Sequence, residues 1–219
     1  THVLTWITFI PIIGALVITF LPKAQENAIK WIALAATLPQ LLLAVVIFRE
    51  FDRTNPGFQF IEGPFNWIEN FHIQYYMGID SISVSMILLT ALISSIAVIA
   101  SWGISKHLKG YFALLLLLDT GMMGTFAALD FFLFYIFWEL MLLPMYFLIG
   151  IWGGPRREYA AIKFFLYTLV GSVFILLVML ATYYYSAGNV FDLVKLSEVQ
   201  THIGPLAVSE TFNWFRFLC

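Results

Sequence analysis

The chain has few charged residues and almost no cysteine. Charged side chains make up 11% of its 219 residues, whereas soluble domains contain about a quarter. The single cysteine, Cys219, excludes a disulfide framework and any metal or iron–sulfur site built from cysteines alone. The sequence contains no basic patch for nucleic acid, no Walker A loop and no G-x-G-x-x-G motif. These absences argue against a soluble nucleotide-binding or nucleic-acid-binding protein.

Hydrophobic residues are abundant instead. They account for 61% of the sequence, and the mean hydropathy is +0.89, which is typical of a helical membrane protein. The first apolar run has no basic region before it and no cleavage pattern, so we interpret it as a membrane span rather than a signal peptide. Because the chain begins at Thr1 and ends within the apolar run FNWFRFLC, we expect it to be part of a longer protein.

Six stretches are long and apolar enough to cross a bilayer, since a spanning helix needs about 20 such residues. A seventh span is expected to begin near Phe212. The sequence therefore predicts an all-α polytopic membrane protein, with about six complete transmembrane helices plus the start of a seventh. The six predicted spans are 4–21, 31–48, 82–104, 111–129, 131–152 and 164–185.

The spans divide the chain into four parts: 1–48 with two helices, an extracytoplasmic loop 49–81, a third helix with its inner loop in 82–109, and 110–219. Alternating runs such as FQFIE and FHIQYY, set between Pro-Gly and Gly-Pro breakers, predict a hairpin or pair of short strands in the loop. The stretch FDLVKLSEVQ (191–200) predicts a short amphipathic helix on the membrane face.

The basic residues predict the orientation of the chain. Seven of the eleven lie on alternate short loops, and positive loops face the cytoplasm. We therefore expect the N-terminus and the segments 49–80 and 186–211 to lie outside. The seven are Lys23, Lys30, Lys106, Lys109, Arg156, Arg157 and Lys163.

Two carboxylates fall deep inside predicted spans, Asp119 in the fourth and Glu139 in the fifth. An ionised side chain at the bilayer centre costs about 2.5–3.5 kcal/mol on insertion scales, so acids at such depth are usually functional. Glu139 lies nine residues after Asp130, which is about 13 Å along a helix and close to the midplane.

Two interpretations of Glu139 follow. It either holds helices together as a protonated acid or relays protons, because burial disfavours its ionised form and a nearby cation favours it. Tyr135 and Tyr146 share its helical face, and Pro144 frees a backbone carbonyl near it. We favour the relay, because ionisable residues inside the membrane are usually functional.

Asp119 and Lys163 are further relay candidates. Asp119 shares its span with Gly121 and Gly124, which are typical of helix packing, so relay and packing both remain open. Lys163 either snorkels to the inner interface or serves a hydrated path along the stripe that it forms with Tyr167. The four histidines lie outside the spans, which excludes a bis-His haem within the bilayer.

The block ALDFFLFYIFWELMLLPMYFLIGIWGGPRREYAAIKFFLYTLVGS (128–172) closely resembles the antiporter-like membrane subunits of respiratory complex I, the proton-translocating NADH:quinone oxidoreductase, and among them the chain M or subunit 4 type. YYMGIDSISVSM (75–86) matches the segment that leads into the third helix of these subunits. The resemblance implies a bundle of about fourteen spans with two inverted repeats, of which this chain is the N-terminal part.

The resemblance also implies roles for individual residues. Glu139 would be the glutamate that pairs with a lysine of the seventh helix, and that lysine is expected shortly after Cys219. Lys163 matches a lysine of the KFFLYT segment, whereas Asp119 matches no acid expected in the family.

The function implied by the resemblance is proton translocation coupled to NADH:quinone oxidoreduction. No cofactor is expected in this chain, whereas NADH, FMN, iron–sulfur clusters and quinone are expected in partner subunits. Its partners would be the neighbouring membrane-arm subunits, the lipid bilayer and protons, without nucleic acid. We expect a bacterial plasma membrane, with a mitochondrial or thylakoid membrane as the alternative. Alternative functions are a subunit of a multisubunit sodium/proton antiporter or membrane-bound hydrogenase, and a structural membrane scaffold.

Overall fold

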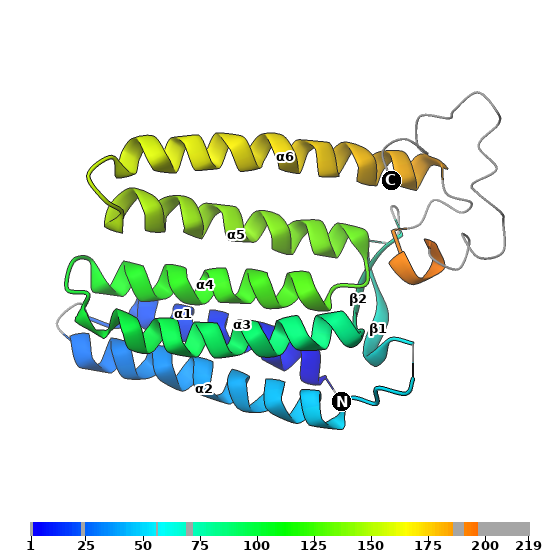
Figure 1. Cartoon of the computed structure of the whole chain (residues 1–219), viewed down its shortest axis with the longest axis horizontal. Helices are drawn as coiled ribbons and strands as arrows, with labels where there is room; N and C mark the ends of the chain where they lie inside the picture. The colour runs from blue at the N-terminus through cyan, green and yellow to red at the C-terminus, as the bar shows by residue number, and fades with distance from the viewer. Residues whose placement is uncertain (1, 23–24, 56, 69–71, 186–190, 197–219) are drawn as a thin grey trace.

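The computed structural model is a bundle of six long helices with a two-stranded hairpin at one end (Figure 1). It describes residues 2–22, 25–55, 57–68, 72–185 and 191–196. Within these residues, six helices are long and apolar enough to span a membrane, as predicted. They are α1 (Val3–Phe20), α2 (Glu26–Glu50), α3 (Ser81–Ala100), α4 (Leu108–Ala127), α5 (Phe131–Trp152) and α6 (Arg157–Tyr185).

Two helices begin at least five residues earlier than the apolar runs predict. α2 begins at Glu26 rather than at residue 31, and α6 begins at Arg157 rather than at residue 164. Both first turns contain a glutamate, Glu26 or Glu158, and a negative charge there is favourable beside the partial positive charge of a helix N-terminus. Hydropathy alone does not detect such polar first turns.

The predicted hairpin is present. Strand β1 (Gln59–Ile68) pairs antiparallel with β2 (Ile73–Ile79), and the hairpin lies across one end of the helix bundle (Figure 1). Of the predicted amphipathic helix at 191–200, residues 193–196 form a helical turn. The Asp192 carboxylate caps it by accepting hydrogen bonds from the backbone N–H groups of Val194 and Lys195. The rest of that helix, and the expected seventh span, lie outside the described residues.

The first four helices form the more tightly packed part of the bundle. Between 33% and 44% of their spanning windows is buried, compared with 17% for α5 and 11% for α6. Two apolar clusters fill the interior of the four. One, near the hairpin, includes Leu4, Ile47, Ile87 and Met123; the other, near the opposite end, includes Ile18, Ile29, Val98 and Phe112.

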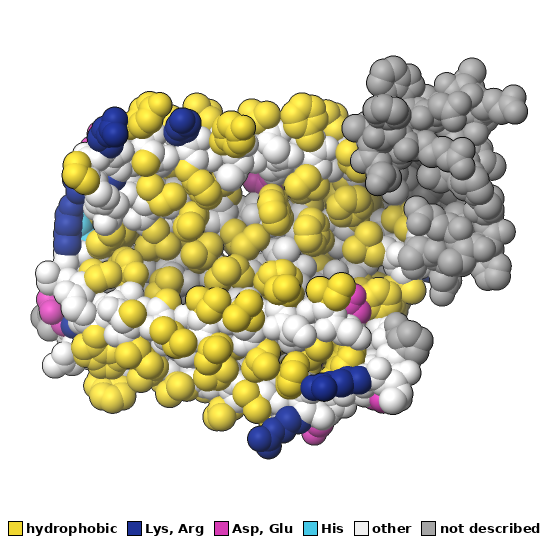
Figure 2. All heavy atoms as spheres, viewed as in Figure 1, with side chains coloured by type: hydrophobic (Ala, Val, Ile, Leu, Met, Phe, Trp, Pro, Cys, Tyr) yellow, Lys and Arg dark blue, Asp and Glu magenta, His cyan; other side chains and the backbone are white. Residues whose placement is uncertain are grey.

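The outer surface matches a membrane environment. On the face shown in Figure 2, hydrophobic side chains cover the length of the bundle, whereas Lys and Arg gather near its two ends. The short connections α1–α2, α3–α4 and α5–α6 all lie at the end opposite the hairpin (Figure 1). At that end, Trp152 donates a hydrogen bond to the backbone oxygen of Lys106 at 2.7 Å. The structure thus separates the basic loops from the hairpin, as the predicted orientation requires.

Candidate functional site

Glu139 lies near the middle of α5. The helix begins at Phe131, and the carboxylate of the preceding Asp130 caps it by accepting hydrogen bonds from the backbone N–H groups of Phe132 at 2.9 Å and Leu133 at 3.0 Å. It continues without a break through Pro144. Because proline has no N–H, the carbonyl of Leu140, next to Glu139, lacks its usual partner within the helix.

The face of α5 that carries Glu139 is directed toward α6. Tyr135 lies four residues before Glu139 and Tyr146 seven after it. Around the helix axis, Tyr135 is therefore only about 40° from Glu139 and Tyr146 only about 20°. Ser172 of α6 donates a hydrogen bond to the Tyr135 hydroxyl at 3.4 Å, and the ring of Tyr146 contacts that of Phe165, with 5.5 Å between centroids. Glu139 therefore belongs to the α5–α6 interface.

The Glu139 carboxylate is only partly paired. The Tyr135 hydroxyl interacts with it from one helical turn away. Its atom Oε1 is buried and has no hydrogen-bond partner among the described residues. Burying a carboxylate oxygen without a partner is costly, so this atom marks a position where a proton, water or another polar group would be stabilised.

Lys163 does not face Glu139. It lies nine residues before Ser172, which is about 900° of helical rotation and thus the opposite side of α6. Since Ser172 contacts α5, Lys163 is directed away from α5, where it is exposed with its Nζ 6.0 Å from the ring centroid of Tyr159. Tyr167, on the same predicted stripe, is 81% exposed. The structure does not bring Lys163 and Glu139 together.

Asp119 is buried on the other side of α4. Only 2% of it is exposed, and its Oδ1 accepts a hydrogen bond from the Ser94 hydroxyl of α3 at 2.5 Å. The Gln40 amide of α2 lies beside the carboxylate but forms no direct hydrogen bond of good geometry. Asp119 is thus surrounded by polar groups from two further helices.

The two membrane acids lie at nearly the same depth. A Cβ at Gly121 would lie 2.6 Å from Cγ of Met141 and 3.2 Å from the backbone oxygen of Phe137, so Gly121 is level with the middle of that segment, at Glu139. Asp119 is two residues earlier, about 3 Å along the axis and about 200° around it. The backbone of α4 therefore separates Asp119 from Glu139.

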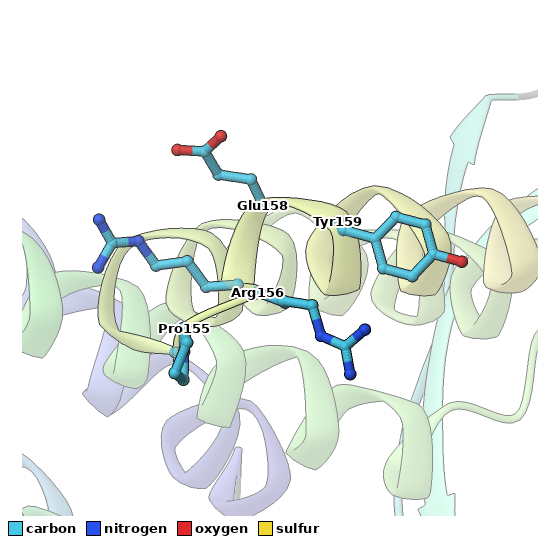
Figure 3. Close-up of a pocket in the computed structure, with 7 residues that line it drawn as sticks. Pro155, Arg156, Glu158 and Tyr159 are labelled. Atoms are coloured by element: carbon cyan, nitrogen blue, oxygen red, sulfur yellow. The ribbon is translucent and has the colours of Figure 1, made fainter.

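The basic connection between α5 and α6 forms a shallow hollow lined by residues 153–159. The carboxylate of Glu158 is directed away from Pro155 and from Tyr159 (Figure 3). Arg156 and Glu158 are exposed, so these charges belong to the solvated loop. In the part of the chain that the structure describes, no three His, Cys, Asp or Glu residues lie close enough to hold a metal ion.

Several polar residues near Asp119 are not apparent as site residues from the sequence. Gln40 lies within an apolar run of α2, and Ser94 belongs to a Ser-Ser pair within the apolar α3. An uncharged polar side chain inside a predicted span, an amide for Gln40 and a hydroxyl for Ser94, is the signal that points to them. Only the packing of the helices shows that both residues meet Asp119.

Comparison with known families covers almost the whole chain. Residues 7–125 match the family described as NADH-ubiquinone oxidoreductase chain 4, amino terminus. Residues 128–218 match the family described as NADH:quinone oxidoreductase/Mrp antiporter, TM.

Curated relatives show the same relationship. The chain is 42% identical to NADH-quinone oxidoreductase subunit M of Rhodobacter capsulatus, over 83% of this chain and 36% of the relative. It is 36% identical to subunit M of Rickettsia felis, over 96% of this chain and 43% of the relative. The chain therefore spans less than half the length of these relatives.

Solved structures share the fold. Respiratory complex I from Thermus thermophilus with bound NADH contains a chain that is similar with a TM-score of 0.72 at 24% identity, covering 88% of this chain and 38% of that one. The Mrp complex from Dietzia sp. gives a TM-score of 0.66 at 20% identity, covering 80% and 19%. With one family matching more than half of its residues, this multi-pass membrane chain belongs to the NADH:quinone oxidoreductase chain 4, or subunit M, family.

Proposed function

We propose that this chain forms the N-terminal part of a proton-translocating membrane-arm subunit of complex I, which couples NADH:quinone oxidoreduction to proton pumping. Membership of the chain 4 family and the shared fold support this function. The observation that carries it is Glu139, a carboxylate near the middle of α5 with a buried, unpaired oxygen at the α5–α6 interface.

Glu139 would bind and release the transported proton. The Ser172 hydroxyl of α6 donates a hydrogen bond to the Tyr135 hydroxyl, which in turn interacts with Glu139. A hydroxyl both donates and accepts, so each can pass a proton on while it remains neutral. These two hydroxyls lie toward the hairpin end of Glu139, because Tyr135 precedes it in a helix that begins at the hairpin end.

The charge of Glu139 would be controlled by a cation that approaches it and leaves. A cation beside a buried carboxylate favours the ionised form, and its departure favours the protonated form. Lys163 is directed to the opposite side of α6, so we propose that this cation comes from outside the described residues. Lys163 would serve a separate, hydrated position at the basic end.

The redox chemistry would take place in other subunits. NADH, FMN, iron–sulfur clusters and quinone would be held by partners, and this chain would contribute the proton path. Its neighbours would be the other membrane-arm subunits, in a bacterial plasma membrane. Relatives named as chain 4 also occur in the cyanobacterium Synechococcus elongatus and in the chloroplast of Mesostigma viride.

The experiment is proton pumping by the assembled complex in membrane vesicles, driven by NADH and measured with a pH-gradient dye. We expect Glu139→Gln to remove most pumping and Glu139→Asp to retain part of it, because only Asp can still exchange a proton. Glu158→Gln, which alters an exposed acid of the basic loop, is the matched control and should pump normally. Full pumping by Glu139→Gln in an assembled complex would contradict the proposal.

A second candidate is a subunit of a sodium/proton antiporter. It is favoured by the Mrp antiporter in the description of the second family match and by the structural likeness to the Mrp complex. Purification of the full-length subunit from its own membrane separates the two functions. Flavin and iron–sulfur subunits should co-purify with a complex I subunit, whereas sodium-dependent proton exchange without them indicates an antiporter.

A further inference from the structure

Polar side chains form a layer across the interior of α1–α4, between the two apolar clusters. On α2, α3 and α4, the residues of the apolar cluster near the hairpin lie on one side of this layer. The residues of the cluster near the opposite end lie on the other side. Each of the four helices contributes at least one buried polar side chain. The set is Thr8, Thr37, Gln40, Ser94, Ser95, Asp119 and Thr120.

The residues of this layer lie at similar depths. α1, α2 and α4 meet at Gly14, where an added Cβ would be 2.6 Å from Cβ of Ala36 and 3.2 Å from Leu116. Measured along the helix axes from the level of Gly14 toward the hairpin, the distance is about 4.5 Å to Asp119, about 6 Å to Gln40 and about 9 Å to Thr8. All three lie in the same direction because α1 runs opposite to α2 and α4 (Figure 1).

Hydrogen bonding divides the layer into two groups. Thr37, Ser95 and Thr120 each donate to a carbonyl of the preceding turn in their own helix. In contrast, Oδ2 of Asp119, both amide atoms of Gln40 and Oγ1 of Thr8 have no partner among the described residues. Buried polar groups are nearly always hydrogen-bonded, so these four atoms indicate a ligand.

The charge of the surroundings limits what Asp119 can be. The cationic residues of α1–α4 in the described structure lie at helix ends: Lys30 and Arg49 are about 13–15 Å along the axis from Gln40, and Lys109 is about 15 Å from Asp119. Among the residues that the structure describes, the only acid at the same depth, Glu139, is on the far side of α4. An isolated buried carboxylate is costly, and binding a proton removes that cost.

We propose that Asp119, Gln40 and Ser94 form a buried proton-binding site, in which Asp119 holds a proton and water bridges it to the other polar groups. The unpaired atoms include an amide donor and carboxyl and amide acceptors, and water can pair with both kinds. A metal cation would be coordinated by the oxygen atoms alone, and the amide N–H groups would remain unpaired. The site is separate from Glu139 and does not rest on the role proposed for that residue.

The test is infrared difference spectroscopy of the complex assembled with the full-length subunit, comparing wild type with Asp119→Asn in H₂O and D₂O. We expect the carbonyl band of a protonated carboxyl at neutral pH that Asp119→Asn removes. The band should shift in D₂O, because water reaches the proton. NADH:quinone reductase activity and co-purification verify that each variant assembles; if Asp119→Asn fails to assemble, Asp119→Glu should move the band instead.

Matched serines test the geometry. Ser94→Ala removes the hydroxyl that donates to Asp119 and should move the band to higher frequency. Ser95→Ala removes a hydroxyl that is bonded to its own helix and should leave the band in place. Glu139→Gln should also leave it in place, even though that change is expected to remove most pumping.

Three results would overturn the proposal. Absence of any carboxyl band from Asp119 at neutral pH would show that the group is ionised. A band that does not shift in D₂O would show a dry cluster that holds no exchangeable proton. A band that disappears when sodium is added would identify the site as a cation site.

Discussion

The Glu62 carboxylate accepts a hydrogen bond from the backbone N–H of Leu4 at 2.7 Å, so a strand residue caps the first transmembrane helix. The same carboxylate accepts from the N–H of Thr5 at 3.0 Å and from its hydroxyl at 2.5 Å. The first N–H groups of a helix have no partner within it, and a negative charge there also interacts favourably with the helix dipole. The hairpin thus completes α1.

We predict that Glu62→Ala destabilises the protein by about 1–2 kcal/mol, because it leaves the N-terminal N–H groups of α1 without their cap. The measurement is the thermal unfolding midpoint of the purified full-length subunit in detergent. Glu50→Ala removes an exposed acid at the end of α2 and is the control. Equal midpoints for the two variants would show that the cap contributes nothing.

We predict a pH-dependent gain of stability for Asp130→Asn. Burial raises the pKa of the Asp130 carboxyl above the ordinary 3.8, despite backbone hydrogen bonds that lower it. The stability contribution of Asp130 is therefore complete below the unfolded pKa and is lost as pH rises through the folded pKa. Asn keeps a capping side chain but does not titrate. The difference in unfolding midpoint, variant minus wild type, should become more positive from about pH 3 to about pH 7.

Asp52 provides the control of opposite sign. Hydrogen bonds from the Thr54 hydroxyl and N–H lower the pKa of Asp52, so its contribution is present above the unfolded pKa and is lost as pH falls through the folded pKa. The difference for Asp52→Asn should therefore become more negative over the same pH series. If the midpoint differences of both variants changed with pH in the same direction, the opposite pKa shifts of Asp130 and Asp52 would be refuted.

We predict that Gly124→Ala destabilises the contact between α4 and α5 by about 1–3 kcal/mol, the usual cost of overpacking. An added Cβ at Gly124 would collide with the ring of Phe137, which is buried in the core cluster. Gly171→Ala is the matched control, because a Cβ there meets nothing within 4 Å. Denaturant unfolding of both variants measures the two costs, and a Gly171→Ala loss as large as that of Gly124→Ala would contradict the packing.

We predict that Lys163→Gln and Glu139→Gln have additive effects on the free energy of unfolding, within about 0.5 kcal/mol. The reason is that Lys163 lies on the side of α6 opposite to the one that contacts α5. A double-mutant cycle on the full-length subunit provides the measurement. A coupling energy well above that limit would show that the two side chains interact directly.

The helices and the hairpin could be predicted from the sequence, because the length of an apolar run and the position of its breakers are local properties. The depth of Glu139 and its alignment with Tyr135 follow from helical spacing alone. The early start of α6 could not be found from hydropathy, since its first turn carries Arg157 and Glu158. That turn is stabilised by electrostatics and by hydrogen bonding rather than by burial.

The neighbours of each acid across helix boundaries could not be predicted. They depend on how far each helix is rotated about its axis, which is set by contacts such as that of Gly124 with Phe137. This rotation places Ser94 against Asp119 and directs Lys163 away from α5. The sequence contains these residues but not their pairing.

The hairpin also has a mechanical consequence. β1 holds the start of α1 through Glu62, and β2 holds the turn between α4 and α5 by accepting the Leu129 N–H at the Tyr76 oxygen and by donating the Gln74 N–H to Asp130. Three helix ends are thereby attached to one small sheet, which resists sliding of any of them along its axis. Asp119 and Glu139 thus keep fixed distances from the hairpin end of the bundle, so the motions that remain open to these helices are rotation and bending deeper in the bundle.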